Sequence, residues 1–336
     1  MHVTVVTITY GRRWHLLRQT LHAALENGAD QAIVVDNEAA DVIGPQADCE
    51  FPGKVHTVRL SKNQGSSGAY SVGLQTALAD GAEYLLLLDD DNRVASDAVT
   101  HLKRAYQSNA QRGPRNDLGV VAFRPSHQPE IFRGGVPDPL GRSNNSFFGF
   151  HLKGLCGQIL KRLSPRRDGC PEEILDSMKA SYSLRVCPFG GLFLHVSVIE
   201  RHGFPDSRFV LYQDDTEFTS RITSSGGQLI LVPCARIDDI EESWHTSRAA
   251  HNSFDRWLLL GSSKQVYYTA RNWAYLQTRR CTHRPVLYMN KVAYLFLMWA
   301  MAVRRHKTGR FHLIVRAIRD GEKGLLGVSA EFPPAS

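Results

Sequence analysis

The first hundred residues alternate between runs of apolar residues and segments in which apolar residues recur at helical spacing. Four apolar runs predict strands, and they cover 3–10 (VTVVTITY), 32–37 (AIVVDN), 54–60 (KVHTVRL) and 84–88 (YLLLL). Helical spacing predicts helices over 12–28 and 66–81, each closed by a glycine. Strands that alternate with helices favour an α/β fold with a mostly parallel central sheet flanked by helices.

The pattern changes further along the chain. A helix is predicted over 96–107 with Ser96 as its N-cap, and the Gly-, Pro- and Asn-rich stretch 124–150 is predicted to be irregular. A further strand is predicted over 226–233, and helical patterns dominate beyond it. We therefore expect a sheet-containing domain over 1–250, with halves 1–123 and 124–250, and a mainly helical region over 251–336.

Polar residues follow each of the four predicted strands. In open parallel sheets, ligands bind beyond the carboxyl ends of the strands, where these residues would meet. They are Tyr10 and Gly11, Asp36 and Asn37, the loop 63–68, and the triplet 89–91. Any one of them taken alone is explained as an ordinary polar loop residue, but their coincidence on one edge predicts a binding crevice.

The triplet Asp89, Asp90 and Asp91 comes directly after four leucines. Adjacent carboxylates repel one another, so they lie in open solvent or hold a cation, and the leucines argue against open solvent. Asp89 and Asp91 can share a ligand while Asp90 points away. A hard ion such as Mg²⁺ or Mn²⁺ suits these oxygens, with substrate phosphates completing its coordination. The alternative is a helix N-terminus at which aspartates complement the macrodipole.

A second acidic pair, Asp214 and Asp215, lies in the segment YQDDTEF. A carboxylate is the group needed to remove the proton of an attacking hydroxyl, and the neighbouring charge raises the affinity of one of the pair for a proton. The alternative is that the pair begins a helix and complements its dipole. Glu217 and Arg221 have the spacing of an ion pair on one helix face.

An ordered series of motifs resembles family 2 glycosyltransferases of the GT-A fold. The motifs are TITYGR, IVVDN, KNQGSSGAYSVGL, LLLLDDDN, the segment GGLFLHVSVIERHGFPDSRFVLYQDDTEFTSRI, and SWHTS, and together they span about 3–247. Within this family they are most similar to bacterial rhamnosyltransferases and galactofuranosyltransferases that build cell-surface polysaccharides. The resemblance implies inverting transfer of galactofuranose or rhamnose from a UDP- or dTDP-sugar to a hydroxyl of a glycan or polyprenyl-linked acceptor.

The resemblance also implies a role for each motif residue. Residues implied to bind the nucleotide sugar are Thr9, Tyr10, Gly11, Asp36, Asn63, Gly68, Asp89 and Asp90. Residues implied to hold Mn²⁺ or Mg²⁺ are Asp89, Asp91 and His245, although a single histidine is equally explained as a structural residue. Asp215 is the implied general base, with Asp214 beside it, and Gly190, Gly191 and Trp244 are the implied acceptor residues.

The chain carries a formal net charge of +7, which favours an anionic partner: nucleic acid, a phosphorylated metabolite or an acidic membrane surface. No basic and aromatic nucleic-acid module is recognisable, so nucleic acid is not an expected partner. The six cysteines show no C-x-x-C pair, and the first apolar run has no basic segment before it. Both features favour a cytoplasmic protein with reduced thiols.

One segment, 286–303, is a membrane candidate. Asn290 and Lys291 interrupt it and leave an apolar run of 12 residues, which is shorter than the roughly 20 residues needed to span a bilayer. Seven Lys or Arg and two acidic residues follow in 304–324. We expect a helix that contacts the anionic inner leaflet from the cytoplasm. The alternative is a core helix followed by a solvated basic tail.

Two other functions compete with glycosyl transfer. A sugar nucleotidyltransferase needs a Gly-rich loop with a basic residue directly after the first strand, and TITYGRRWHLL lacks such a loop. A non-catalytic binding homologue would not depend on Asp91 or Asp215.

Overall fold

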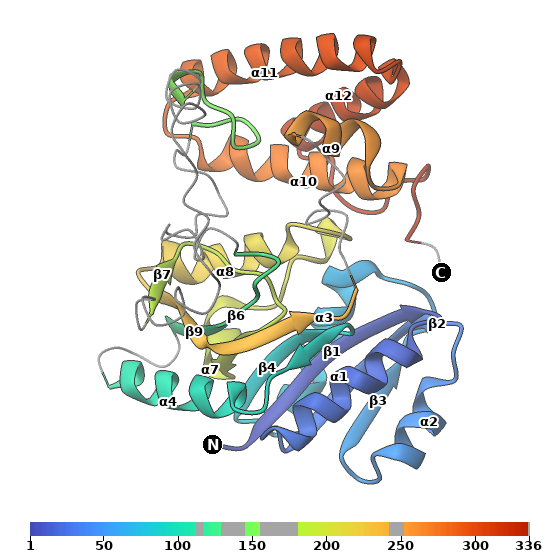
Figure 1. Cartoon of the computed structure of the whole chain (residues 1–336), viewed down its shortest axis with the longest axis vertical. Helices are drawn as coiled ribbons and strands as arrows, with labels where there is room; N and C mark the ends of the chain where they lie inside the picture. The colour runs from blue at the N-terminus through green and yellow to red at the C-terminus, as the bar shows by residue number, and fades with distance from the viewer. Residues whose placement is uncertain (112–116, 129–144, 155–180, 242–251, 335–336) are drawn as a thin grey trace, which may run out of the picture. The chain divides into compact units, whose positions relative to one another are not determined.

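The computed structural model describes residues 1–111, 117–128, 145–154, 181–241 and 252–334. It shows a mixed α/β protein with a helical C-terminal region, as the sequence predicts (Figure 1). Two compact units make up the chain. The sheet unit comprises 1–137, 178–242 and 328–336, and the helical unit comprises 138–177 and 243–327.

The predicted strands and helices of the first hundred residues are present, together with elements that the sequence pattern does not predict. The sheet unit contains β1 (Val3–Gly11), α1 (Trp14–Glu26), β2 (Gln31–Ala39), α2 (Ile43–Glu50), β3 (Val55–Arg59), α3 (Gly65–Ala79), β4 (Tyr84–Asp89), β5 (Asn92–Val94), α4 (Ala98–Ala110), β6 (Leu118–Phe123), β7 (Tyr182–Leu184), β8 (Leu192–His195), α7 (Ser197–His202), η3 (Ser207–Phe209), α8 (Asp214–Ser224) and β9 (Gln228–Asp239). The helical unit contains α9 (Ser253–Leu259), α10 (Ser263–Arg280), α11 (Arg284–Arg304) and α12 (Thr308–Lys323).

Within the described residues, nine strands form one sheet in the order β3-β2-β1-β4-β8-β6-β9-β5, and β7 pairs with β9. Strands β3, β2, β1 and β4 are parallel, and Thr9 lies opposite Asp36 while Ile8 lies opposite Asp89. Beyond β4 the sheet is mixed, because β8 runs antiparallel to both β4 and β6. The parallel half therefore brings the carboxyl ends of β1, β2 and β4 to one edge.

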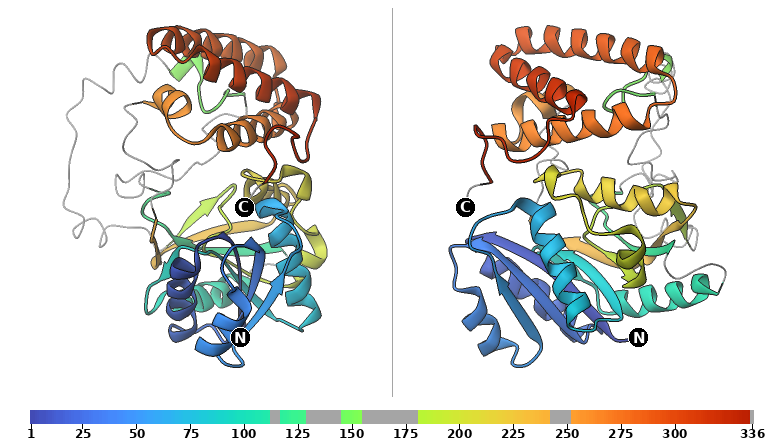
Figure 2. Two further views of the ribbon diagram at one scale, coloured as in Figure 1. Left: turned by 90° about the vertical axis from the view of Figure 1, so that its right-hand side faces the viewer. Right: turned by 180° about the vertical axis from the view of Figure 1, so that it is seen from behind.

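Helices cover both faces of the sheet, which is why its strands are nearly continuously apolar. Apolar residues of α1, α2 and α4 pack on one face, including Leu21, Ala47 and Leu102. Those of α3, α7 and α8 pack on the other face, including Leu74 and Phe218 (Figures 1 and 2). Alternate residues of each strand enter the two cores, as the period of a strand requires.

Two local predictions are wrong. The residue at the N-cap of α4 is Asp97 rather than Ser96, and its side chain makes no capping hydrogen bond. Strand β9 does not end at Pro233 but continues to Asp239. The register between β6 and β9 shifts between Ala122 and Phe123, across from Pro233, so the proline lies at an irregularity where no ladder hydrogen bond is lost.

In the helical unit, α10 packs against α12, and α11 packs against α12 and α9. Gly321 allows the close approach of α12 to α10, because a Cβ on it would lie 2.0 Å from the carbonyl oxygen of Arg271. Helix α10 begins with a capping box between Ser262 and Gln265. An aromatic cluster of Phe147, Phe148, Trp257, Trp273 and Tyr294 connects α9, α10 and α11 with the segment 145–154.

Candidate active site

The acidic triplet lies at the edge of the sheet. Asp89 is the last residue of β4, Asp90 and Asp91 form a turn, and Asn92 begins β5. No helix begins at the triplet, since α4 starts at Ala98. The explanation of the triplet as a helix N-terminus is therefore wrong.

Asp90 is directed into the protein. Its carboxylate accepts a hydrogen bond from Thr9 Oγ1 at 2.9 Å and two from the guanidinium of Arg13, whose Nε lies 2.9 Å from Oδ2. Burial raises the pKa of Asp90, while Arg13 and Thr9 act against this increase. Asp90 and Thr9 thus fasten β1 to the turn, and their contact with a nucleotide sugar stays a prediction.

Asp89 is held by two buried groups. Its Oδ2 accepts a hydrogen bond from Nη1 of Arg124 at 2.9 Å, and its Oδ1 lies 3.2 Å from the hydroxyl of Tyr70, which also donates to the carbonyl of Leu88 at 2.8 Å. Arg124 is 4% exposed, and its guanidinium also binds Asp239 at the end of β9. The orientation of Asp89 is therefore set by Arg124, which connects the ends of β4, β6 and β9.

Gly190 permits this arrangement. A Cβ at this position would lie 2.1 Å from Nη1 of Arg124 and 2.6 Å from Oδ2 of Asp89. Gly191 has a φ of +93° and donates its N–H to the carbonyl of Leu87. Both glycines lie beside Asp89, and their predicted contact with an acceptor stays a prediction.

We expect Gly190→Ala to lower the free energy of unfolding by about 1–3 kcal/mol, because the added methyl group must displace the buried Arg124. Urea unfolding measures the difference. Gly309→Ala is the matched control, since no atom lies within 4 Å of its added Cβ. Wild-type stability in Gly190→Ala would show that Arg124 does not depend on this close packing.

Asp91 has an excess of negative charge around it. Burial, together with the nearby carboxylates of Asp89 and Asp90, raises the pKa of Asp91 to about 7. Its nearest recorded cation is Nη2 of Arg13 at 3.6 Å, and Arg13 is already bound to Asp90. A carboxylate in this environment is suited to a cation supplied from outside the protein.

The donor set fits a divalent ion bound jointly with a phosphate group. Asp91 would be the principal ligand, since Oδ2 of Asp89 already accepts a hydrogen bond from the buried Arg124. Within the described segments, no three His, Cys, Asp or Glu side chains come together as a metal site. Mg²⁺ commonly takes only one or two carboxylates and completes its shell with phosphate and water. The predicted ligand His245 and the predicted acceptor residue Trp244 lie outside the described residues.

The second acidic pair begins α8. Asp214 is buried and accepts a hydrogen bond from the hydroxyl of Ser66 at 2.9 Å. Burial raises the pKa of both carboxyls, with a further increase from Asp215 acting on Asp214 and from Asp89 acting on Asp215. Each is thereby brought closer to the pKa that suits a general base at neutral pH. Glu217 and Arg221 form the predicted ion pair at 3.1 Å.

Four residues, 210–213, connect η3 to α8, and three of them have unusual backbone angles. Val210, Tyr212 and Gln213 have φ values of 66°, 64° and 64°, a region that side chains other than glycine rarely occupy. Such strain is found where the surrounding structure holds a functional segment in place. Here the carbonyl of Val210 approaches Gly65 so closely that a Cβ on Gly65 would lie 2.1 Å from it.

Helix α3 brings the two acidic groups together. Ser66 donates a hydrogen bond to Asp214, and the hydroxyl of Tyr70, one turn further along the same face, lies 3.2 Å from Asp89 while it donates to the carbonyl of Leu88. The triplet at the end of β4 and the pair at the start of α8 therefore lie along one helix face, although about 125 residues separate them in the sequence.

The other predicted donor-binding residues lie on the loops around this edge. Asp36 is buried and accepts hydrogen bonds from the backbone N–H of Ala39 and from Arg59 at 2.9 Å. Asn63 binds Asn37 at 3.1 Å, so the loops after β2 and β3 are joined. Gly68 lies on α3, where a Cβ would meet the side chain of Gln64, and Gly11 ends β1 with a φ of 57°.

Tyr10 differs from these residues because it is 47% exposed. The guanidinium of Arg13 lies over this ring at 5.3 Å from its centroid. Burial of the hydroxyl raises the pKa of Tyr10. An exposed aromatic ring beside the carboxyl ends of β1 and β2 is suited to stacking on a planar group such as a nucleobase.

Sequence reasoning missed several residues that form this site. They are Arg13, Tyr70, Asn92, Arg124 and Asp239. Arg124 and Asp239 each follow an apolar run at the same edge of the sheet. The rule that identified Asp36 and Asp89 would have found both, had β6 and the full length of β9 been predicted.

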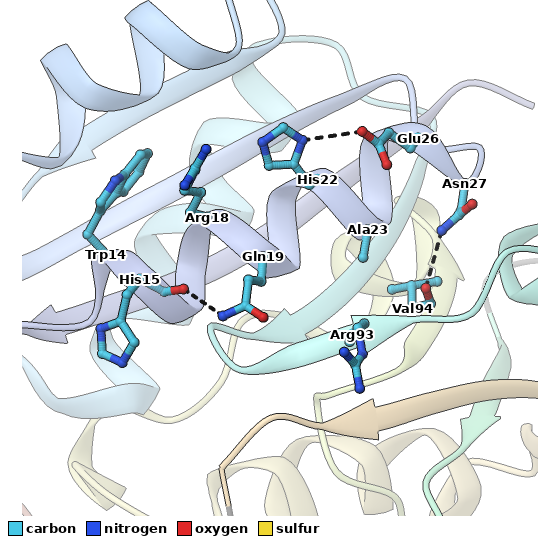
Figure 3. Close-up of a pocket in the computed structure, with 10 residues that line it drawn as sticks. All are labelled: Trp14, His15, Arg18, Gln19, His22, Ala23, Glu26, Asn27, Arg93 and Val94. Atoms are coloured by element: carbon cyan, nitrogen blue, oxygen red, sulfur yellow. Dashed lines mark hydrogen bonds and ion pairs between the residues drawn. The ribbon is translucent and has the colours of Figure 1, made fainter.

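Among the described residues, the surface of the sheet unit has hollows at two places that bear on the site. One, of about 610 Å³, runs along α1 beside Arg93 and Val94 of β5, and none of its lining residues belongs to the predicted site (Figure 3). The other, of about 470 Å³, lies between α2 and β3 and includes Asp36 and Arg59 in its lining. The second hollow thus adjoins the predicted nucleotide-binding edge.

The sheet, its flanking helices and the acidic edge define the GT-A class of glycosyltransferase folds. The structure is similar to GalNAc-T7 crystallised with UDP, GalNAc and Mn²⁺, with a TM-score of 0.52 and 18% identity over 80% of this chain and 48% of that one. It is similar to Staphylococcus aureus TarS 1-349 in complex with UDP-GlcNAc, with a TM-score of 0.50 and 14% identity over 95% and 82% of the two chains. At such identities the likeness shows the fold.

Residues 4–147 match the family described as Glycosyl transferase family 2. The chain is 28% identical over 109 residues to the dTDP-rhamnosyl transferase RfbF of Shigella flexneri, covering 32% of this chain and 35% of that protein. It is 29% identical over 233 residues to the galactofuranosyltransferase GlfT1 of Mycolicibacterium smegmatis, covering 67% and 66%. The matched segments span less than two thirds of either relative.

Proposed function

We propose that this protein is an inverting glycosyltransferase that moves a sugar from a nucleotide diphosphate donor to a hydroxyl group of a glycan or lipid-linked glycan. Its relatives favour rhamnose or galactofuranose as the sugar and a dTDP or UDP carrier. The family 2 domain and its similarity to RfbF and GlfT1 support the transfer of a nucleotide-linked sugar. The sugar and the acceptor are the specific part of the proposal.

The observation that carries the proposal is that one helix, α3, contacts both the acidic triplet and the acidic pair. Transfer needs one group that receives the donor's diphosphate and another that removes the acceptor's proton, separated by the width of a sugar. In this proposal Asp89, which contacts Tyr70, and the neighbouring Asp91 would take the first role, and Asp214, which accepts from Ser66, and the neighbouring Asp215 would take the second. The two ends are thus fixed by one rigid element.

In the proposed reaction, Asp215 accepts the proton of the acceptor hydroxyl while its oxygen attacks the anomeric carbon. A carbon–oxygen bond forms on one face of the sugar, and the bond to the diphosphate oxygen breaks on the other, which inverts the configuration. Asp91 and Asp89 would hold Mn²⁺ or Mg²⁺, which supplies stabilisation of the negative charge on the departing diphosphate. Tyr10 and Asp36 would bind the base and ribose, at the edge beside the hollow of α2 and β3.

The test is incubation of the full chain with a panel of nucleotide sugars, including dTDP-rhamnose and UDP-galactofuranose, with Mn²⁺ or Mg²⁺. Release of nucleoside diphosphate is followed with and without chelator. We expect release from one donor, strengthened by an acceptor glycan and abolished by chelator. Donor binding without any release would favour a non-catalytic homologue, and release of a nucleoside triphosphate from sugar nucleotide and pyrophosphate would favour a nucleotidyltransferase.

A further inference from the structure

Helix α11 carries an apolar stripe on its outer face. The exposed apolar side chains of this helix are Tyr288, Met289, Val292, Phe296, Trp299 and Val303. They recur every three or four residues, so they lie on one side of the helix along about 22 Å of its length. Phe296 and Tyr288 are 63% and 66% exposed. Large aromatic residues at this exposure form a continuous apolar surface, which soluble proteins normally keep small.

The opposite face of α11 is packed against the helical unit. The residues buried there are Asn290, Tyr294, Met298 and Ala302, which recur every four residues. Asn290 donates a hydrogen bond to the carbonyl of Asn145 at 2.8 Å and accepts one from the backbone N–H of Leu152 at 3.0 Å. Lys291 forms an ion pair with Glu322 of α12 at 2.6 Å. These contacts hold α11 on the protein along its length.

By length and composition α11 is the one helix in the described part of the chain that could cross a membrane. A spanning helix would have to give up the contacts of Asn290 and Lys291 and expose both to lipid, which is unfavourable. A helix that keeps one face on protein and offers the other to its surroundings is suited to lying in the plane of a bilayer surface.

The charged residues of the α11 segment itself are all basic. Residues 284–307 contain no Asp or Glu, and Arg284 lies at one end of the helix while Arg304, Arg305 and Lys307 lie at the other. Arg305 is paired with Asp255. No ion pair is found among the described residues for Arg284, Arg304 or Lys307, and all three are exposed. Cations at both ends of an apolar stripe complement the negative surface of a membrane that contains anionic lipid.

We propose that the outer face of α11 docks on an anionic lipid bilayer. The stripe enters the boundary between head groups and acyl chains, with Tyr288 and Trp299 at the level where amphipathic aromatic rings are favoured. Arg284, Arg304 and Lys307 bind the phosphates of the head groups. This proposal needs no enzymatic activity, so it stands or falls separately from the proposed transfer reaction.

The experiment is flotation of the full chain with vesicles of phosphatidylcholine containing 30% phosphatidylglycerol, compared with phosphatidylcholine alone. We expect binding to the anionic vesicles that falls as salt rises. Phe296→Ser/Trp299→Ser should weaken it by roughly tenfold or more, because two large apolar side chains leave the lipid. Arg304→Glu/Lys307→Glu should weaken binding to anionic vesicles and leave the weak binding to neutral vesicles unchanged.

Leu259→Ser is the matched control, because Leu259 is an exposed apolar residue of the same unit that lies on α9 rather than α11. It should bind as the wild type does. All of the changed residues are exposed, and unaltered thermal unfolding in each variant confirms that the fold is intact. Absence of wild-type binding, equal binding by the Phe296→Ser/Trp299→Ser variant, or retention on vesicles after carbonate washing would each overturn the proposal. A dimer in solution that this same variant dissociates would assign the stripe to a second copy instead.

Discussion

Asp215→Asn is expected to reduce the turnover of donor and acceptor by about 10²–10⁴-fold, the contribution typical of a positioned general base. An amide cannot accept the proton of the attacking hydroxyl, and the substitution keeps the size of the side chain. The affinity for donor should change little, because the proposed contacts with the diphosphate are made by Asp89 and Asp91 and not by Asp215. Steady-state kinetics with saturating acceptor, together with donor binding by calorimetry, measure the two effects separately.

Glu217→Gln is the matched control for this result. It lies half a turn further along α8 and pairs with Arg221 rather than facing the acidic cluster, so turnover should stay within a few-fold of the wild type. Asp214→Asn shows which member of the pair carries the proton.

The turnover of the wild type should decrease as the pH is lowered. The apparent pKa of this decrease should lie above the ordinary carboxyl value of about 4, because burial raises the pKa of Asp215. Full turnover in Asp215→Asn would exclude it as the base.

Asp91→Asn is expected to have two opposite effects: loss of metal-dependent turnover by at least about 10²-fold, and a more stable fold in the absence of divalent ions. The folded protein has an Asp91 pKa of about 7, whereas an unfolded chain has a value near 3.9. Between these values the folded state binds more protons, so the free energy of unfolding decreases as pH rises from about 4 to about 7. The asparagine variant lacks this loss and should be about 1–3 kcal/mol more stable at pH 8.

Thermal and urea unfolding at pH 5 and pH 8 measure this difference, with chelator present. The variant and the wild type should converge in stability towards the lower pH. Mn²⁺ with nucleoside diphosphate should raise the melting temperature of the wild type but not that of Asp91→Asn. Glu83→Gln, an exposed carboxylate just before β4, is the control and should match the wild type in each measurement. A destabilised Asp91→Asn that retains turnover would contradict the role assigned to this carboxyl.

The elements that the sequence predicts well are those whose pattern is complete within a short segment. Strands β1, β2 and β4 are apolar on both faces, and the helices between them show a regular apolar spacing. The acidic triplet was found because it directly follows β4, and the acidic pair because it begins α8. Helix α2 was missed because its eight residues carry only two buried apolar side chains, Ile43 and Ala47.

The hydrogen bonds and ion pairs that orient the site residues join segments that are distant in the sequence. Arg124 is one of 40 Lys and Arg residues, and nothing beside it in the sequence indicates that Asp89 and Asp239 neutralise it. Pro233 obscured the length of β9, because a proline normally ends a strand unless a register shift accommodates it. The direction of the Asp90 side chain likewise depends on Arg13, which belongs to another element.

The attachment of both acidic groups to α3 limits how the site can change. Ser66 and Tyr70 are one turn apart, so their Cα atoms are offset by roughly 6 Å along the helix axis. Because one helix contacts both carboxyls, the spacing between the end of β4 and the start of α8 is fixed whatever sequence the surrounding loops adopt. Insertion or deletion of one residue between Ser66 and Tyr70 would rotate one of them by about 100° off the shared face and break this link between Asp89 and Asp214.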